Sequence, residues 1–309
     1  MSRHGHSKRP RASALLKLSM LRAGCVLGGR LAPRHTVDHA ARLFATPSAS
    51  SRSRARAVRV EGEMQRHTVE ANNQVIATYV WGDPQRQPYA LLVHGWSSFG
   101  LRFLPWVERL RQAGLAVVTF DQPGHGYSSG ERCSLPDFVH TIHAIGRRYA
   151  RARLAIGHSL GGAAVALAQG ETWCAERIVA IAPPASMEAA AERFMRFIGL
   201  GSHLRDRFLG WHERATGVKV RDLDVRSHLR ALGQPCLIVH DLDDFEVPWG
   251  EGELYAQHWH SARLLTTQGL GHHKVLDAPE VMDAVLAFTR GERVGDRIVA
   301  SPDLSFVLG

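Results

Sequence analysis

The chain has 309 residues, of which 45% are hydrophobic, so it can form one large domain with a substantial core or two smaller ones. Its formal net charge of +9 would suit a nucleic-acid binder, but this charge is unevenly distributed. Residues 1–60 hold thirteen Lys or Arg and one acid, whereas residues 61–309 carry a net charge of −3. Nucleic-acid binding by the body of the chain is therefore not expected.

The basic segment, residues 1–60, is predicted to form an N-terminal extension of short helices and a linker. Residues 12–31 are rich in leucine but contain Lys17, Arg22 and Arg30, so they suit neither a membrane span nor a signal-peptide core. A second short helix is expected near residues 36–44, and the composition of residues 46–52 is typical of a linker.

Three roles remain open for this extension. It can pack on the body or stay disordered, attach the chain peripherally to an anionic membrane, or tether it to nucleic acid. The last role has the least support, because the arginines are not interleaved with aromatic residues. If the segment is a dispensable tail, deleting residues 1–60 should leave the turnover of a small soluble ester within a few-fold of the full chain.

The four cysteines are scattered, without a C-x-x-C pair or a histidine at metal-ligand spacing: Cys25, Cys133, Cys174 and Cys236. No disulfide framework is expected, which fits a reducing compartment and a cytoplasmic location, with peripheral membrane contact as the alternative. No spacing indicates a metal site or an organic cofactor, so we predict neither. The sequence leaves the oligomeric state open.

From residue 66 onward, apolar runs typical of strands alternate with helical patterns. Two strands, at residues 66–70 and 74–81, flank Asn72-Asn73, a dipeptide typical of a hairpin turn. Six more strands are expected at 89–93, 115–120, 153–157, 178–182, 236–239 and 262–267, and helices at 103–112, 135–149, 160–168, 251–258 and 279–289. This alternation predicts an α/β fold with a mostly parallel, eight-stranded sheet covered by helices on both faces.

The interval between residues 182 and 234 lacks a strand pattern and holds helical stretches near 187–198 and 203–214. Because it follows the sixth strand, we expect a small helical cap, at about residues 185–233, over the carboxyl edge of the sheet. The predicted organisation is thus an extension over residues 1–60, an α/β domain over 61–290 that includes this cap, and a C-terminal tail over 291–309.

Gly157-His158-Ser159-Leu160-Gly161 places a serine between a predicted strand and a predicted helix. Glycine two residues before and two residues after the serine indicates a backbone too tight for side chains at those positions. The hydroxyl of Ser159 is then exposed at the edge of the sheet. The first N–H groups of the helix point toward any negative charge that forms beside it. Ser159 is therefore a candidate nucleophile.

A serine hydroxyl needs a general base, and the base needs an acid that orients it. Both kinds of side chain follow the last two predicted strands. The candidate acids are Asp241, Asp243, Asp244 and Glu246. The candidate bases are His272 and His273.

Five motifs, spread over residues 89–290 in order, resemble those of the α/β-hydrolase superfamily. They are His94-Gly95-Trp96, the run from Phe120 to Ser128, the Ser159 turn, His240…Asp244…Val247-Pro248 and Gly269-Leu270-Gly271-His272. The resemblance is to the serine-esterase branch with short helical caps, which includes monoacylglycerol-lipase-like enzymes. It implies Ser159 as nucleophile, His272 as base and Asp244 as orienting acid. It also implies an oxyanion hole formed by the backbone N–H groups of Trp96 and Leu160.

The resemblance also ranks the alternative residues. The Gly-x-Gly-His register favours His272 over His273, and the position four residues after His240 favours Asp244 over its neighbouring acids. Asp241 stands where glycine is usual, so this loop departs from the family pattern. Structural roles are implied for His94, His125 and His158, and Asp121 is expected to anchor the glycine-rich turn that follows it.

The implied activity is hydrolysis of carboxylic esters through an acyl-enzyme, without a metal. Thioester hydrolysis, acyl transfer and a haloperoxidase side activity use the same triad and remain alternatives, as does a non-catalytic binding protein on this fold. Serine rather than aspartate at position 159 argues against dehalogenase or epoxide hydrolase chemistry. Apolar residues of the predicted cap, such as Phe194, Phe197 and Phe208, suit a small-molecule ester with an apolar acyl chain or an aromatic group.

Overall fold

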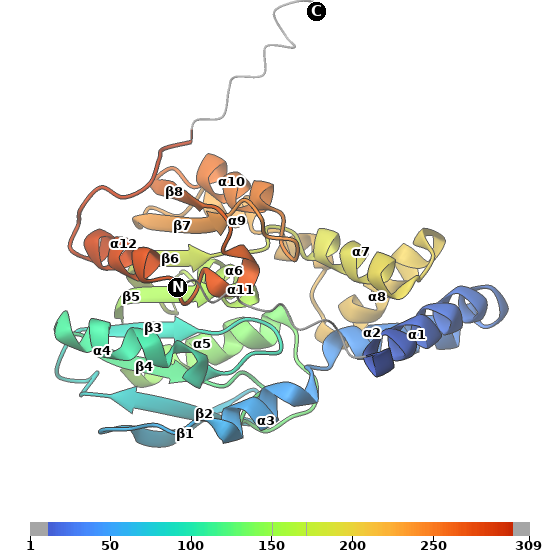
Figure 1. Cartoon of the computed structure of the whole chain (residues 1–309), viewed down its shortest axis with the longest axis horizontal. Coiled ribbons are helices and arrows are strands. Elements are labelled where there is room, and N and C mark those ends of the chain that lie inside the picture. The colour runs from blue at the N-terminus through green and yellow to red at the C-terminus, as the bar shows by residue number, and fades with distance from the viewer. Residues whose placement is uncertain (1–11, 150, 171, 299–309) are drawn as a thin grey trace, which may run out of the picture. The chain divides into compact units, whose positions relative to one another are not determined.

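An eight-stranded sheet forms the body of the chain in the computed structural model, which describes residues 12–149, 151–170 and 172–298 (Figure 1). The strand order is β1-β2-β4-β3-β5-β6-β7-β8. The strands are β1 (Gln65–Ala71), β2 (Gln74–Trp81), β3 (Tyr89–Val93), β4 (Ala116–Phe120), β5 (Ala152–His158), β6 (Ala175–Ile181), β7 (Cys236–Asp241) and β8 (Ala262–Thr267). β2 pairs antiparallel with β1 and β4, and every other neighbouring pair is parallel. The predicted mostly parallel sheet is confirmed.

The hairpin between β1 and β2 turns at Asn72 and Asn73, whose φ angles are 48° and 59°. Two successive left-handed residues match a type I′ turn, and asparagine tolerates that conformation better than most residues. The dipeptide therefore sets the register of the β1–β2 hairpin, as predicted.

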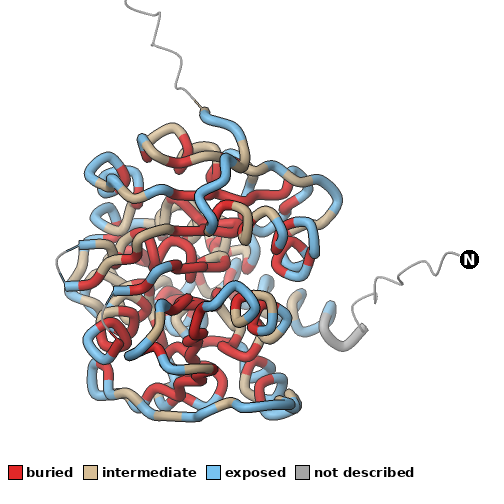
Figure 2. Tube along the Cα trace, turned by 90° about the vertical axis from the view of Figure 1, so that its left-hand side faces the viewer, coloured by how far each residue is buried: buried red, intermediate tan, exposed pale blue. Residues whose placement is uncertain are grey.

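Helices cover both faces of the sheet, and two separate cores fill the space beneath them. Alternating strand residues point into different cores: Leu91 and Val93 of β3 into one, Ala90 and Leu92 into the other. The first core also contains residues of α5 (Leu135–Tyr149), α6 (Leu160–Leu167) and α10 (Trp249–His258), and the second contains residues of α4 (Leu104–Gln112) and α12 (Pro279–Thr289). Burial on both faces explains why the central strands are continuously apolar (Figure 2).

The remaining elements are short and lie between the longer ones along the chain. They are η1 (Gly100–Phe103), η2 (Ser202–Leu204), η3 (Val220–Leu223), α9 (Arg226–Leu229) and α11 (Gly271–Lys274). After α12, Asp296 forms an antiparallel bridge with Leu264 of β8, so the first part of the predicted C-terminal tail pairs with the sheet edge. The tail beyond residue 298 lies outside the described residues.

A separate helical unit consists of residues 188–217 together with the N-terminal segment up to Phe44. It contains α1 (Ala12–Leu31), most of α2 (Pro33–Ala45), most of α7 (Met187–Ile198) and α8 (Arg205–Thr216). The ring of Phe44 lies 4.9 Å from that of Phe194 and 5.7 Å from that of Phe208. α2 therefore packs with the helices inserted after β6. That these helices cap the sheet stays a prediction.

The predicted linker at residues 46–52 differs from the structure, in which α3 (Ala49–Ala57) begins inside that interval. Ser48 caps this helix, because its side chain accepts a hydrogen bond from the backbone N–H of Ser50. Alanine and arginine, which favour helices strongly, make up most of the later turns and outweigh the serines.

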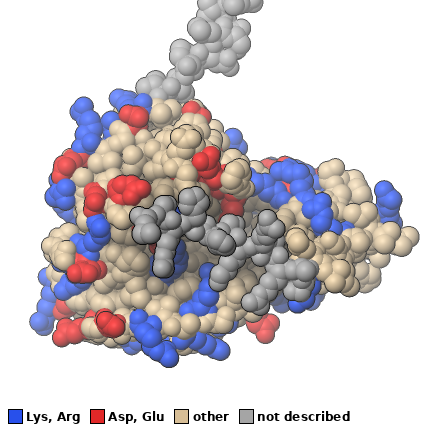
Figure 3. Space-filling view, in the orientation of Figure 1, with Lys and Arg blue, Asp and Glu red and all other residues tan. Residues whose placement is uncertain are grey.

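Charges of both signs are interspersed over the visible face of the sheet-containing body (Figure 3), which agrees with its nearly neutral sequence. None of the helices in the described part of the chain combines the length and apolar character needed to cross a bilayer.

Candidate active site

Ser159 lies at a sharp turn between β5 and α6, with φ 54° and ψ −127°. This left-handed backbone is strained for a residue with a side chain, and such residues persist only where their surroundings hold them. The backbone N–H of Ser159 donates to the carbonyl of Ile181 (2.8 Å), and its own carbonyl accepts from the N–H of Gly162 (2.8 Å). The turn is therefore held from both sides.

The glycines around Ser159 are required by close backbone contacts. A Cβ atom at Gly157 would lie 2.3 Å from the carbonyl oxygen of Gly161, and one at Gly161 would lie 2.3 Å from that of Val93. A Cβ at Gly95 would lie 2.8 Å from the Cβ of Ser159. The serine turn thus packs directly against the loop after β3, which leaves no space for larger residues.

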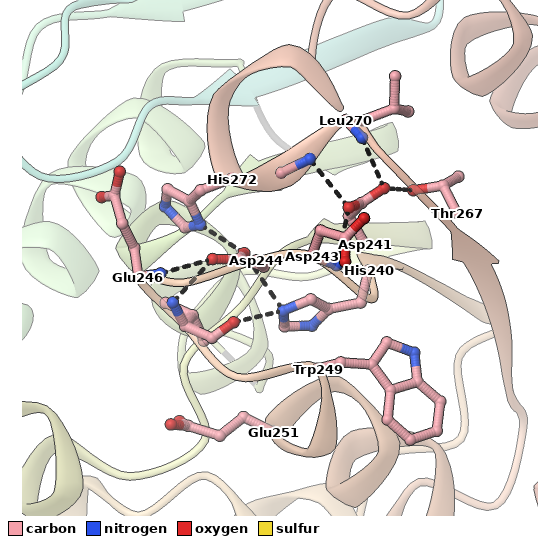
Figure 4. Close-up of polar contacts among 12 residues, drawn as sticks. His240, Asp241, Asp243, Asp244, Glu246, Trp249, Glu251, Thr267, Leu270 and His272 are labelled. Carbon is pink, nitrogen blue, oxygen red and sulfur yellow. Dashed lines mark hydrogen bonds and ion pairs between the residues drawn. The ribbon is translucent and has the colours of Figure 1, made fainter. Parts of the chain in front are cut away.

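Asp244 and His272 meet through a hydrogen bond of 2.7 Å between Oδ2 and Nδ1 (Figure 4). The other carboxylate oxygen of Asp244 accepts from the backbone N–H groups of Glu246 and Val247, both at 2.9 Å. His240 Nε2 lies 3.4 Å from Oδ2. Both Asp244 and His272 are buried, so this contact is shielded from water.

The protonation state of Asp244 follows from these contacts. Burial alone raises the pKa of Asp244, but hydrogen bonds from His240, His272 and the N–H of Val247 outweigh it, so the pKa lies below its usual range. Because an ionised carboxylate only accepts hydrogen bonds, His272 Nδ1 carries the donated proton. In the neutral ring, Nε2 of His272 is then free to accept a proton.

The neighbouring acids have other partners. Asp241 accepts from the hydroxyl of Thr267 (2.7 Å) and from the N–H groups of Leu270 (3.1 Å) and Gly271 (2.9 Å). Asp243 accepts from the N–H of Gly269 (3.0 Å). The aspartate found where glycine is usual therefore shapes the loop that carries His272.

The two adjacent histidines also have different partners. His273 Nε2 lies 2.9 Å from a carboxylate oxygen of Glu246, and both side chains are largely exposed. The hydrogen bond with Glu246 raises the pKa of His273. His272, in contrast, is buried against Asp244. Of the two adjacent histidines, His272 is therefore the one bonded to Asp244.

Three further histidines near the site hold loops in place. His158 Nε2 donates to the backbone carbonyl of His272 (2.8 Å), and His94 Nε2 accepts from the N–H of Gln122 (2.9 Å). Burial lowers the pKa of His158 to about 3, of His94 to about 4 and of His125 to about 3. All three rings are therefore neutral at physiological pH.

Asp121 has the anchoring contacts expected for the turn after β4. Its carboxylate accepts from the N–H groups of Gly100 (2.7 Å) and Tyr127 (2.8 Å) and from the hydroxyl of Tyr79 (2.7 Å). A Cβ at Gly126 would lie 2.1 Å from this carboxylate, which explains the glycine there.

A pocket of about 450 Å³ brings together Ser159, His272 and Trp96. Asp244 lies behind His272, outside the pocket lining. Leu160 is the first residue of α6, so its N–H has no acceptor within the helix. In the described part of the chain, no hydrogen bond joins the Ser159 hydroxyl to His272. The pocket lining also includes Arg54, Gly95, Ser97, Ser98, Arg102, His158, Glu246 and His273.

Among the described residues, one group has the spacing to hold a metal ion: His158, His272 and His273, whose ligand atoms lie within 4.8 Å of one another. Each ring already uses one nitrogen in a hydrogen bond. A cation bound there would occupy the nitrogen of His272 that faces the pocket, which a general base needs free. Adding a chelator therefore distinguishes a metal site from a metal-free base.

A model of the alpha/beta hydrolase family matches residues 90–285, which is more than half of the chain and contains the Ser159 turn, Asp244 and His272. The chain belongs to this family. A pimeloyl-[acyl-carrier protein] methyl ester esterase of Nitrosomonas europaea is 26% identical over 62% of this hydrolase and 92% of its own length. A monoglyceride lipase of Rattus norvegicus is 30% identical over 34% of the hydrolase and 38% of its own length.

Solved structures of esterases have the same fold as this chain. An esterase from Exiguobacterium antarcticum superposes with a TM-score of 0.56 and 16% identity, over 72% of this hydrolase and 98% of the esterase. The predictions of an α/β-hydrolase fold and of an esterase-like member of the superfamily are confirmed.

Some residues that line the pocket of this hydrolase were not predicted. Arg54 comes from α3, in the segment expected to be a tail, and Arg102 forms two hydrogen bonds of 2.5 Å to Asp277. The serine that caps α3 and the helix-favouring residues after it could have revealed the helix. No local sequence signal indicates that Arg54 reaches the pocket.

Proposed function

We propose that this α/β hydrolase cleaves carboxylic esters through an acyl-enzyme formed on Ser159. The observation that supports this most directly is the strained serine turn facing the same pocket as His272, whose other nitrogen is bonded to Asp244. Ser159 Oγ attacks the ester carbonyl carbon while His272 Nε2 takes the hydroxyl proton. The same proton then passes to the leaving alcohol oxygen as the carbon–oxygen bond breaks.

Water completes the cycle by the same route. His272 takes a proton from water, the hydroxide attacks the acyl carbon, and Ser159 leaves with the proton from His272. The N–H groups of Leu160 and Trp96 stabilise the oxyanion of both tetrahedral intermediates. Leu160 begins α6, so the helix dipole adds to its effect.

The substrate we propose is a small-molecule ester with an apolar acyl or aromatic part. Two relatives are named for ester substrates, a methyl ester and a monoglyceride. Nitrophenyl esters of graded acyl length, assayed beside acyl thioesters, test this reaction and its thioesterase alternative. A fluorophosphonate that reacts with activated serines tests the nucleophile.

The rate should fall at low pH, because a protonated His272 cannot accept the hydroxyl proton of Ser159. His158, His94 and His125 cannot cause this loss, since their lowered pKa values of about 3 to 4 keep them neutral throughout. Asp244, whose pKa is lowered, stays ionised.

A pH–rate profile of kcat/KM measures this limb, with His273→Asn as the matched control. That substitution should leave the position of the limb unchanged, because His273 faces Glu246 rather than Ser159. The same profile in EDTA should superpose on the untreated one. A loss of activity in EDTA that a divalent cation restores would contradict a metal-free reaction.

We also propose that α1 attaches this hydrolase to an anionic membrane surface. Leu16, Met20, Leu27 and Leu31 are 62%, 66%, 58% and 84% exposed. Their spacing places them on one side of the helix, opposite the buried Cys25. Exposed basic residues flank this stripe, and no acid precedes Asp38 in the sequence. Each Lys or Arg near an anionic surface contributes about 1 kcal/mol of attraction.

Full-length protein should therefore co-sediment with vesicles containing phosphatidylserine, and less with vesicles of phosphatidylcholine alone. Salt should weaken the binding. The double substitution Leu16→Ser, Leu27→Ser should reduce it severalfold, whereas Leu43→Ser on α2 should not. If the stripe instead pairs with a second copy of this chain, lipid-free protein will sediment as a dimer and the double substitution will give monomers. That result would overturn the membrane proposal.

A further inference from the structure

Ser97, which follows Trp96 in the pocket, has a left-handed backbone with φ 52°. This conformation is unfavourable for serine and persists only where contacts enforce it. Three hydrogen bonds hold the residue. Its N–H donates to His125 Nε2 (3.0 Å), its hydroxyl oxygen accepts from the N–H of Ser48 (2.9 Å), and its carbonyl accepts from Arg54 Nη2 (2.6 Å).

Two of these three contacts, those from Ser48 and Arg54, come from the predicted extension over residues 1–60. Arg54 also lies over the ring of Phe99, 5.7 Å from its centroid, and its side chain lines the pocket. Its guanidinium therefore lies between the surface of α3 and the loop that carries Trp96. Ala55, the next residue of α3, is buried in the core beneath the sheet, so the helix is fixed to the body.

The same helix also fixes the neighbouring loop after β4. Arg52 donates to the carbonyls of Gly126 (3.2 Å), Ser128 (2.9 Å) and Gly130 (2.7 Å). This loop contains His125, the third partner of Ser97. Every hydrogen bond that holds Ser97 is thus supplied by α3, by its capping residue or by a loop that α3 fastens.

We propose that Arg54 of α3 is a positioning residue for the oxyanion hole. By holding the carbonyl of Ser97, Arg54 keeps the strained backbone in place, so that the N–H of Trp96 stays directed at the forming oxyanion. This inference rests on the proposed function, and it replaces the expectation that residues 1–60 are a dispensable tail. An oxyanion donor acts only if it is already aimed at the charge that develops, so a small shift of this loop lowers kcat more than it alters binding.

The test compares Arg54→Met, Arg54→Lys and the matched control Arg56→Met in the full-length chain. Removing an oxyanion donor outright costs about 10²- to 10³-fold in kcat, so loosening one through Arg54→Met should cost about tenfold or more, with KM within about twofold. Arg54→Lys keeps a donor for the carbonyl of Ser97 and should recover much of the rate. Arg56 is exposed on the same helix, and Arg56→Met should match the wild type.

A second readout does not depend on activity. Hydrogen exchange of the peptide covering residues 94–103 should be faster in Arg54→Met than in the wild type and unchanged in Arg56→Met. Wild-type exchange in Arg54→Met would overturn the inference. So would a rise in KM confined to esters that carry an acidic group, since Arg54 would then bind substrate. A wild-type chain that hydrolyses no ester overturns the proposed function, whereas an active chain with unchanged kcat in Arg54→Met overturns this inference alone.

Discussion

Replacing Ser159 with alanine should abolish both ester turnover and labelling by a fluorophosphonate. The serine is the only group in the proposed reaction that forms a covalent bond to the acyl carbon, so no other side chain can substitute for it. Triad members act as a unit, and the expected loss in kcat is about 10⁴- to 10⁶-fold. Mass spectrometry of the labelled wild type should locate the adduct on Ser159. Labelling at another residue, with Ser159 unmodified, would sink the proposed mechanism.

The adjacent histidines provide a matched pair for the same experiment. His272→Ala should lower kcat by a factor comparable to Ser159→Ala, because the base that accepts the serine proton is lost. His273→Ala should change kcat by no more than about tenfold, since His273 contacts Glu246 and not Asp244. If the large loss instead follows the substitution of His273, then the register of the base is wrong by one residue.

The parts of the site that depend on local geometry could be predicted from the sequence. Glycines at positions 157 and 161 indicated a tight turn around Ser159, and in the structure a backbone carbonyl oxygen lies 2.3 Å from the place of each missing Cβ. The parallel sheet could also be predicted, from the alternation of apolar runs with helical patterns. Side chains that must be buried on both faces of a strand leave a continuous apolar pattern.

Contacts between distant segments left no such pattern. Arg54 and Ser97 are 43 residues apart, and nothing in the sequence near either one indicates that they meet. The loop after β7 is a similar case: the sequence marked Asp241 as a candidate acid and as a departure from glycine, but not as an acceptor for the backbone N–H groups of residues 270 and 271. The helical unit formed by the N-terminal segment and the insertion after β6 was not predicted either, because its two segments lie far apart in the chain.

The second large effect is expected at Asp244, where Asp244→Asn should lower kcat by about 10⁴-fold while the protein stays folded. Asparagine fills the same volume and can still accept from the N–H groups of Glu246 and Val247. Its amide nitrogen, however, is a hydrogen-bond donor and faces His272. His272 must then accept at Nδ1 and carry its proton on Nε2, where it can no longer take the proton of Ser159.

Two neighbouring aspartates distinguish this tautomer effect from damage to the loops. Asp243→Asn keeps an acceptor for the N–H of Gly269 and should leave kcat within about threefold of the wild type. Asp241→Asn places a donor among the hydroxyl and N–H groups that Asp241 now binds, so it should lower the midpoint of thermal unfolding. The measurements are kcat and the midpoint of thermal unfolding for Asp241→Asn, Asp243→Asn and Asp244→Asn. If Asp241→Asn reduces kcat as much as Asp244→Asn without destabilising the fold, then Asp241 is the residue that orients His272, and the assignment of Asp244 fails.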